Sequence, residues 1–509
     1  MLNKTVRPLI PARRAVMDVD GTGSSSGGVA YPQRPSIQIN IDKASYIPKD
    51  HDDDERRILS QSGSSLLNLP AELLDSILSC LSPNDLDAVV YSCRQLYIRG
   101  TNDHLWQPLV QENVPGCILE SPWPFPSYRS LYRAHDPHWF IPKMKIWFGD
   151  QHLFGQAMIT FYNPYLGTID GYRLVSERAP AIEELWEHDP NVIIVSFKPK
   201  LRLHTDTPLL RLRGLSSHRY DLEIPMSLGG LTDTIAESNF MLARPAEAYS
   251  GSSVWPPPPT LWPPPTIPAN QRSIIGDEIS AYHAHVTTIN HTLAGAQKPQ
   301  NRKEINEYVF RIRQSMHTVL GHRAESLQRS TYATLDPALY TPTDTRPFRG
   351  VWVGDYSGHG CEFIFLNQPD AEEPFDESTI VKQSNESHEQ YIARKKDAQV
   401  YRGRLEAIKL TGDPNIPRGQ YTFIAEDIGN EGFVRIAKED QFKGARIVRS
   451  KGHYADTNFT SAGYVEGQLI LISPNRIAQY WGGMDHISFF ERVKLDGFII
   501  PNPITDMAR

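Results

Sequence analysis

Cysteine is scarce in this chain, which carries only Cys80, Cys93, Cys117 and Cys361 and no C-x-x-C pair. A disulfide framework needs several paired cysteines, so this scarcity favours a reducing compartment. No apolar run reaches the roughly 18 residues that a transmembrane helix needs. The N-terminal residues also lack the apolar centre of a signal peptide. We therefore expect no membrane contact and a cytoplasmic or nuclear location.

An excess of positive charge is also missing, because 59 acidic residues outnumber 52 basic ones and the net charge is −7. Nucleic-acid binders usually carry a basic domain, so we expect no nucleic-acid partner. The G-x-S-x-G, P-loop, H-E-x-x-H and dinucleotide motifs are absent from the sequence. His283, His285 and His291 lie in a polar stretch without cysteine partners, which is a weak zinc pattern. We predict a non-enzyme with no cofactor and no metal.

The length of 509 residues predicts several folded units. Residues 1–64 contain Gly-Ser runs, scattered prolines and the acidic run Asp52–Glu55, with few grouped apolar residues. Such a segment buries too little surface to offset its ordering entropy, so we predict a disordered tail.

Residues 65–113 change to a helical pattern in which leucine and isoleucine recur at spacings of three and four. Pro70 suits the first turn of one helix, and Ser82 suits the cap of the next. Helices this short are unstable alone and must pack together. Two interpretations follow from the residues: a bundle that buries its apolar side chains internally, or a module that keeps one apolar face for a partner.

The spaced residues of this segment resemble the F-box family over residues 66–112, with a mild departure at Ser79-Cys80. The resemblance implies a small three-helix unit that binds a Skp-type adaptor and, through it, a cullin-RING scaffold. It implies that Trp106 braces the unit internally. It also implies an adaptor contact made by Leu69, Pro70, Leu73, Leu74, Ile77, Leu78 and Leu81. The matching pattern is Leu69-Pro70-x-Glu72-Leu73-Leu74-x-x-Ile77, then Leu81, Asp85-Leu86, Cys93-Arg94 and Leu105-Trp106.

After a helical linker at 114–135, residues 136–500 show short β-rich runs that predict an antiparallel barrel or sandwich. An insertion at about 244–335 interrupts them. Within it, the prolines of 255–268 predict either an insertion loop tethered by its tryptophans or a ligand for WW or SH3 domains. The spacing of apolar residues at 300–327 predicts a helix. The polar composition of 371–399 predicts a mobile loop. Residues 501–509 are expected to form a C-terminal tail. The fold class is therefore α+β: a disordered tail, a helical F-box, and a large antiparallel β-barrel with helical and proline-rich insertions.

Two blocks in this part resemble the C-terminal domain of a second family, the relatives of F-box only protein thirty-one. Gly350–Phe363 contains G-x-Y-x-x-H-G-x-E, and Lys409–Gln420 reads KLTGDPNIPRGQ. A weaker third block lies near Gly452–Val493, so the resemblance covers most of 128–500. It implies a β-barrel substrate receptor that captures client proteins through their C-terminal ends.

The two blocks contain the candidate client-binding residues. Glycines around His359 permit a tight turn or a close approach to a ligand, and Asp413-Pro414-Asn415 has the composition of a turn. These polar groups either bind a client or satisfy one another within their own loops. We name as candidates Tyr356, His359, Glu362, Asp413, Asn415 and Gln420.

Together these features predict a substrate-recognition subunit of an SCF-type (Skp-cullin-F-box) ubiquitin ligase, which captures clients for ubiquitination and proteasomal degradation. The alternative is an F-box protein in a cullin-free adaptor complex, where the barrel acts as a scaffold or binds a small molecule.

Overall fold

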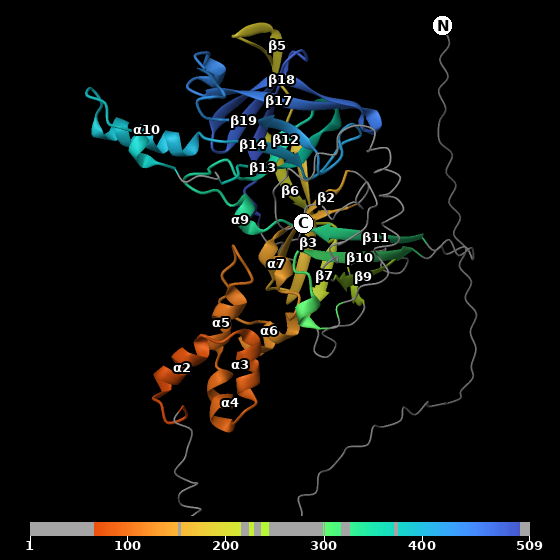
Figure 1. Ribbon diagram of the computed structural model, residues 1–509. Helices are drawn as coiled ribbons and strands as arrows, with labels where there is room; N and C mark the ends of the chain where they lie inside the picture. Colours follow the sequence, from red (N-terminus) through yellow and green to blue (C-terminus); the bar gives the residue numbers. More distant parts are fainter. Residues whose placement is uncertain are drawn as a thin grey trace, which may run out of the picture. The chain divides into compact units, whose positions relative to one another are not determined.

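The computed structural model describes residues 66–150, 154–214, 223–226, 228, 236–243, 299, 301–316, 326–370 and 375–498 (Figure 1). The predicted tails at 1–64 and 501–509, the proline-rich segment 255–268 and the three histidines between 283 and 291 lie outside these residues.

The predicted helical unit is confirmed, but it contains four short helices where the resemblance implied three. The side chain of Ser82 accepts a hydrogen bond from the Asp85 amide at the start of the second helix, as the sequence predicts. A Cβ on Gly100 would approach Val90 to 2.7 Å, so this glycine permits the close packing of the second helix on the third. The helices are α2 (Ala71–Ser79), α3 (Pro83–Val90), α4 (Arg94–Gly100) and α5 (Asp103–Gln111).

Two further helices, α6 (Tyr128–His135) and α7 (Phe140–Met144), connect this unit to the β-strands. The Arg129 guanidinium donates twice to the Asp87 carboxylate, at 2.7 and 3.1 Å, and the Tyr128 amide donates to Asp103 at 2.9 Å. Both ion-pair side chains are largely buried, so these contacts attach the start of α6 to α3 and α5.

The first of two sheets runs in the order β6-β3-β2-β1-β11-β10-β9-β8, with β7 paired to β3. All its pairings are antiparallel. Its strands are β1 (Ile146–Gly149), β2 (Gln156–Asn163), β3 (Thr168–Arg178), β6 (Pro199–His204), β7 (Leu210–Arg213), β8 (Ile224–Met226), β9 (Ala236–Leu242), β10 (Val309–Met316) and β11 (Ser326–Ala333).

The second sheet contains the predicted barrel, in the order β12-β13-β14-β15-β17-β18-β19-β20, and a pairing of β12 with β20 closes it. Three strands extend it: β16 pairs with β17, and β5 and β4 continue outward from β20. The short helix α9 (Pro337–Tyr340) precedes β12. The strands are β4 (Glu183–Trp186), β5 (Asp189–Val195), β12 (Gly350–Asp355), β13 (Cys361–Asn367), β14 (Leu405–Lys409), β15 (Tyr421–Ala425), β16 (Phe433–Ile436), β17 (Arg446–Asp456), β18 (Thr460–Ser473), β19 (Arg476–Trp481) and β20 (His486–Arg492).

The helix predicted at 300–327 is wrong, because the described part of this range contains a short 3-10 turn (Arg302–Glu304), then β10 and the start of β11. Phe310 pairs with Leu242 on one side and with Tyr332 on the other. Spacings of three and four also occur by chance in a strand such as β10, where apolar and polar residues are mixed, and pairing with distant strands decides the outcome here. These strands belong to the first sheet, so that part of the predicted insertion is an integral element.

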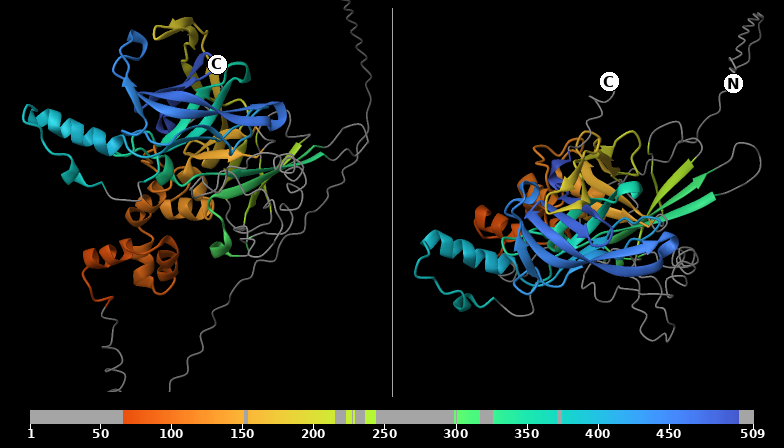
Figure 2. Two further views of the ribbon diagram at one scale, coloured as in Figure 1. Left: turned by 45° about the horizontal axis from the view of Figure 1, so that its top comes forward. Right: turned by 90° about the horizontal axis from the view of Figure 1, so that it is seen from above.

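The loop predicted at 371–399 is also wrong from residue 388 onward, where α10 (His388–Val400) begins. Ser387 and Gln390 form a capping box at its start. Arg394 donates to Glu386 at 2.8 and 2.9 Å, which fastens the preceding segment to the helix. Both views show α10 extending away from the barrel (Figures 1 and 2), and only Val400 at its end is buried.

One apolar cluster includes side chains from both sheets, such as Phe148 and Ile159 from the first and Phe365 and Ile487 from the second. A second cluster, around Trp352, Phe423 and Phe490, fills the barrel. The sheets therefore share a core, which holds the loops at the barrel's ends on a rigid support.

Candidate functional site

The predicted adaptor contact divides into exposed and buried residues. Leu73 is 52% exposed and Ile77 is 42% exposed, one helical turn apart on α2. Pro70 is exposed beside them, and Leu69 and Leu81 are half-buried. Large apolar side chains that face solvent on a short helix are typical of a binding surface.

Leu74 and Leu78 must be removed from the predicted contact surface, because they are only 1% and 2% exposed. They alternate with Leu73 and Ile77 and pack inside the helical unit. Trp106 braces the unit internally as predicted: it is fully buried, and its indole donates to the Gly100 carbonyl at 2.7 Å. Tyr97 and Ile98 on α4 add apolar exposure that the sequence prediction did not include.

In the barrel, three candidate residues meet around a lysine at the end of β14. The Lys409 ammonium donates to Glu362 at 2.7 Å and also to Asp413, and it lies 4.2 Å from the centre of the Tyr356 ring. The Lys409 side chain is fully buried, and both carboxylates are almost so. The Tyr356 hydroxyl donates to Thr422 at 2.9 Å. We call Tyr356, Glu362, Lys409 and Asp413 the buried polar network.

The two carboxyl groups of this network have opposite pKa shifts. Burial raises the pKa of Glu362 to about 8, against the opposing pull of the Lys409 charge. Burial also acts on Asp413, but the charge and hydrogen bond of Lys409 outweigh it and lower the Asp413 pKa. A hydrogen bond between the two carboxyl groups contributes to both shifts. Near neutral pH, a pKa of about 8 favours the protonated form of Glu362, while Asp413 is ionised and Lys409 balances its charge.

This arrangement predicts that Glu362→Gln flattens the pH dependence of stability. Because the folded-state pKa of Glu362 lies above its ordinary value of about 4.3, wild-type stability falls as pH rises between the two values. The free-energy cost of ionising the buried Glu362 is absent when the pH is below the unfolded-state pKa, and it is complete above about pH 8. A glutamine amide donates like the protonated acid at every pH, so the variant should gain on the order of 2–4 kcal/mol relative to wild type between pH 5 and 8. Denaturant unfolding across that range measures this, and parallel curves would refute the assignment.

The loop between β14 and β15 folds around Asp413. Its carboxylate accepts hydrogen bonds from the Asn415 and Ile416 amides at 2.7 and 2.6 Å. This agrees with the alternative, left open by the sequence, that the polar groups satisfy one another within their own loop. The Asn415 amide group donates to the Ala455 carbonyl on β17 at 2.8 Å. The Asn458 amide of the β17–β18 turn donates to the Pro414 carbonyl, also at 2.8 Å. The loop is therefore fastened to the tip of that hairpin.

The remaining candidates lie outside the network. His359 is exposed in the turn between β12 and β13, and its amide donates to the Tyr356 carbonyl at 3.1 Å. Gln420 is buried immediately before β15. Of the six candidates, His359 is exposed, Tyr356 and Asn415 are partly exposed, and the other three are buried. Client binding by all six stays a prediction.

Sequence reasoning missed Lys409, although it appears in the quoted block. The signal was present: a lone lysine ends the apolar strand LEAIK, all five residues of which are buried. A buried lysine requires a partner anion, so its position predicts the nearby carboxylates.

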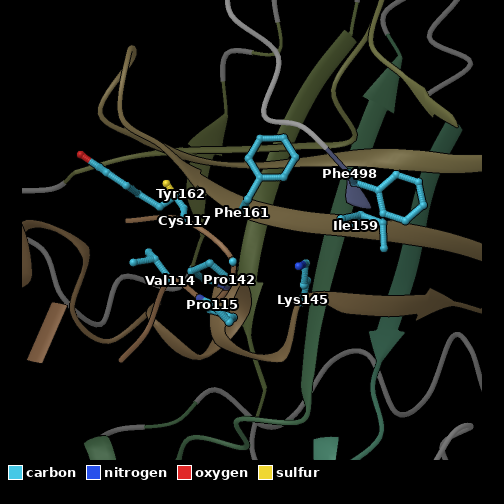
Figure 3. Close-up of a pocket in the computed structure, with 10 residues that line it drawn as sticks. Val114, Pro115, Cys117, Pro142, Lys145, Ile159, Phe161, Tyr162 and Phe498 are labelled. Atoms are coloured by element: carbon cyan, nitrogen blue, oxygen red, sulfur yellow. The ribbon is translucent and has the colours of Figure 1, made fainter. Parts of the chain in front are cut away.

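A small cavity lies between the chain after α5, the turn before β1 and strand β2 (Figure 3). Its volume is about 20 Å³, which holds about one water molecule and no drug-sized ligand. In the described ranges no three histidine, cysteine or acidic side chains gather as for a metal ion, and no helix is long and apolar enough to cross a membrane.

Comparison with known protein families agrees with the two-part construction. Residues 66–112 match the family described as F-box-like, which includes α2–α5 and supports placing the chain among the F-box proteins. Such proteins are typically non-catalytic adaptors. Residues 332–497 match the family described as Cyclin D1 binding domain, a range that contains the barrel strands and all six candidate residues.

Curated relatives are similar to part of the chain only. Protein EXECUTER 2, chloroplastic, of Arabidopsis thaliana is 29% identical over 160 residues, which is 31% of this chain and 22% of that protein. Its namesake from Oryza sativa subsp. japonica is 26% identical over 162 residues, 30% of this chain and 21% of that protein. Protein EXECUTER 1, chloroplastic, of Arabidopsis thaliana is 27% identical over 104 residues, which is 18% of this chain and 15% of that protein. The chain thus spans about a fifth of these relatives.

Proposed function

We propose that this chain is the substrate-recognition subunit of an SCF-type ubiquitin ligase, working in the cytoplasm or nucleus. One observation carries the proposal: an F-box-like unit with an exposed apolar turn, Leu73 and Ile77, is joined to a barrel that matches a cyclin-binding family. The F-box binds a Skp-type adaptor and, through it, a cullin-RING scaffold. The chain contributes proximity between the client and the ubiquitin-carrying enzyme rather than bond chemistry.

The client is a protein held at the barrel end where the β14–β15 loop meets the β17–β18 hairpin. The family description makes a cyclin the first client to test, and the resemblance to known receptors favours capture by a C-terminal end.

Co-purification tests the assignment to a ligase. Tagged chain from cell extract should recover the Skp-type adaptor and a cullin together, because the cullin joins through the adaptor. Recovery of the adaptor without any cullin would contradict the ligase assignment and favour the cullin-free complex.

We expect Asp413→Ala to weaken client capture about tenfold while leaving adaptor binding unchanged. Asp413 holds the Asn415 and Ile416 amides, so its loss releases the loop that faces the client. Losing a site's preorganisation commonly costs about this much affinity. Binding of purified cyclin D1 measures it.

A control for the loss of an aspartate that caps a turn is Asp376→Ala, because Asp376 also accepts from a backbone amide two residues on, that of Ser378. Asp376 is exposed in the segment before α10, whereas Asp413 also balances the buried Lys409. This control should bind cyclin D1 like wild type. Equal affinity for all three chains would show that the β14–β15 loop is not the client site.

A further inference from the structure

The β4–β5 hairpin is anchored to the barrel by its inner side chains. Trp186, Val192 and Ile194 are buried in the core that the two sheets share. The Trp186 indole also donates to Glu439 at 3.2 Å, and β5 pairs in parallel with the start of β20. Figure 1 shows the hairpin, labelled at β5, at the top of the barrel. The hairpin is therefore held in place without help from the side chains on its outer face.

The outer face of this hairpin carries aliphatic side chains. Leu185 on β4 lies opposite Ile193 on β5, and Ile193 lies opposite His486 on β20, so the three residues form one row. The strand register is regular up to Leu185 and shifts only beyond it. Leu185 is 61% exposed and Ile193 is 41% exposed. We call these two side chains the aliphatic face. A strand that packs one side on a core normally turns polar residues to water, so neighbouring aliphatic residues there indicate a binding surface.

Carboxylates surround the aliphatic face. Glu183 lies two residues before Leu185 and therefore on the same side of β4. Asp485 is exposed beside β5, where its carbonyl accepts from the Ile193 amide at 3.0 Å. Among the described residues, Glu183 and Asp485 form no ion pair. Residues 179–197 contain no lysine or arginine but four acidic residues, Glu183, Glu184, Glu187 and Asp189.

This charge decides what can cover the aliphatic face. A second copy of the hairpin would bring four more carboxylates against the first four, and like charges across an interface cost affinity. A nucleic acid or an anionic membrane is repelled for the same reason. A protein segment with aliphatic side chains beside lysine or arginine removes the apolar surface from water and also meets opposite charge.

We propose that the aliphatic face of the β4–β5 hairpin binds a segment of a partner protein in which aliphatic residues are flanked by lysine or arginine. Leu185 and Ile193 supply affinity by burial, and the carboxylates around them select for positive charge. The face shares no residue with the β14–β15 loop or with the exposed turn of α2. It is a third binding surface and goes beyond the proposed function.

The first test uses the full chain and a phage-displayed library of random dodecapeptides. The library is depleted on the double variant Leu185→Ser, Ile193→Ser and then selected on wild type. Both side chains are exposed, so the variant should unfold at the same temperature as wild type. The enriched peptides should carry net positive charge and aliphatic residues. They should bind the double variant at least about tenfold more weakly, because two aliphatic contacts are lost.

The second test changes charge and leaves the aliphatic face intact. Glu183→Lys with Glu184→Lys should weaken the enriched peptides about fivefold at low salt, and the difference should shrink at high salt because ions screen exposed charges. The control is Glu389→Lys with Asp397→Lys, which reverses two exposed carboxylates on α10 and should bind like wild type.

Four results would overturn the proposal. They are a depleted library that enriches no peptide, enriched peptides without basic residues, equal binding to wild type and both hairpin variants, and a wild-type dimer that the serine variant dissociates. The last result would assign the face to a second copy of the chain. None of these measurements uses the adaptor or a client, so their failure leaves the proposed function standing.

Discussion

Replacing Leu73 and Ile77 together with aspartate should abolish adaptor binding, with a loss of at least about a hundredfold in affinity. Both side chains face solvent on α2, so the double variant should fold, because no buried contact of the helical unit is removed. In the complex, two carboxylates would have to be buried without partners, and each costs several kcal/mol or forces the interface apart. Titration of purified Skp-type adaptor into the chain measures the loss.

The control for that experiment places the same charges elsewhere. Val381 and Ile392 are also exposed aliphatic residues, 73% and 48%, in and before α10. Val381→Asp with Ile392→Asp adds the same two carboxylates and should bind adaptor like wild type. If the α2 variant binds as tightly as this control, the adaptor face lies elsewhere on the chain.

Lys409→Met should destabilise the barrel by about 3–5 kcal/mol. The methionine fills a similar volume, but it leaves Asp413 ionised and buried beside Glu362 with no cation. The contact of the ammonium with the Tyr356 ring is lost as well. Denaturant unfolding followed by tryptophan fluorescence measures the change.

Two comparisons separate charge from shape in this prediction. Lys143→Met breaks an exposed ion pair with Glu112, 2.7 Å long, and should cost less than about 1 kcal/mol. Adding Glu362→Gln and Asp413→Asn to Lys409→Met should recover much of the loss, because neutral amides need no cation. If the triple variant is no more stable than Lys409→Met, the lost charge balance is not the cause.

The F-box could be predicted from the sequence because its signal is local. Leucines at spacings of three and four, a proline in the first turn and the Ser82 cap all lie within a few residues of what they determine. The same spacing could not separate Leu73 from Leu74, because both belong to one broad apolar arc and only the packed unit shows which side chain is covered.

The first sheet and the buried polar network depend on contacts between distant residues. β10 is a strand because β9 and β11 pair with it, and local spacing alone indicated a helix. Lys409 meets a glutamate 47 residues away, so its role appears only once β13 and β14 lie side by side. The sequence could place the β14–β15 loop, but not the hairpin that holds it.

The central claim is that one end of the chain joins the ligase and the other holds the client. Mass spectrometry of proteins captured by wild type and by the Leu73→Asp, Ile77→Asp variant, with proteasomal degradation blocked, tests it most directly. Both chains should capture the same clients, and only those bound to wild type should carry ubiquitin. Equal ubiquitination of the clients on both chains would contradict the account.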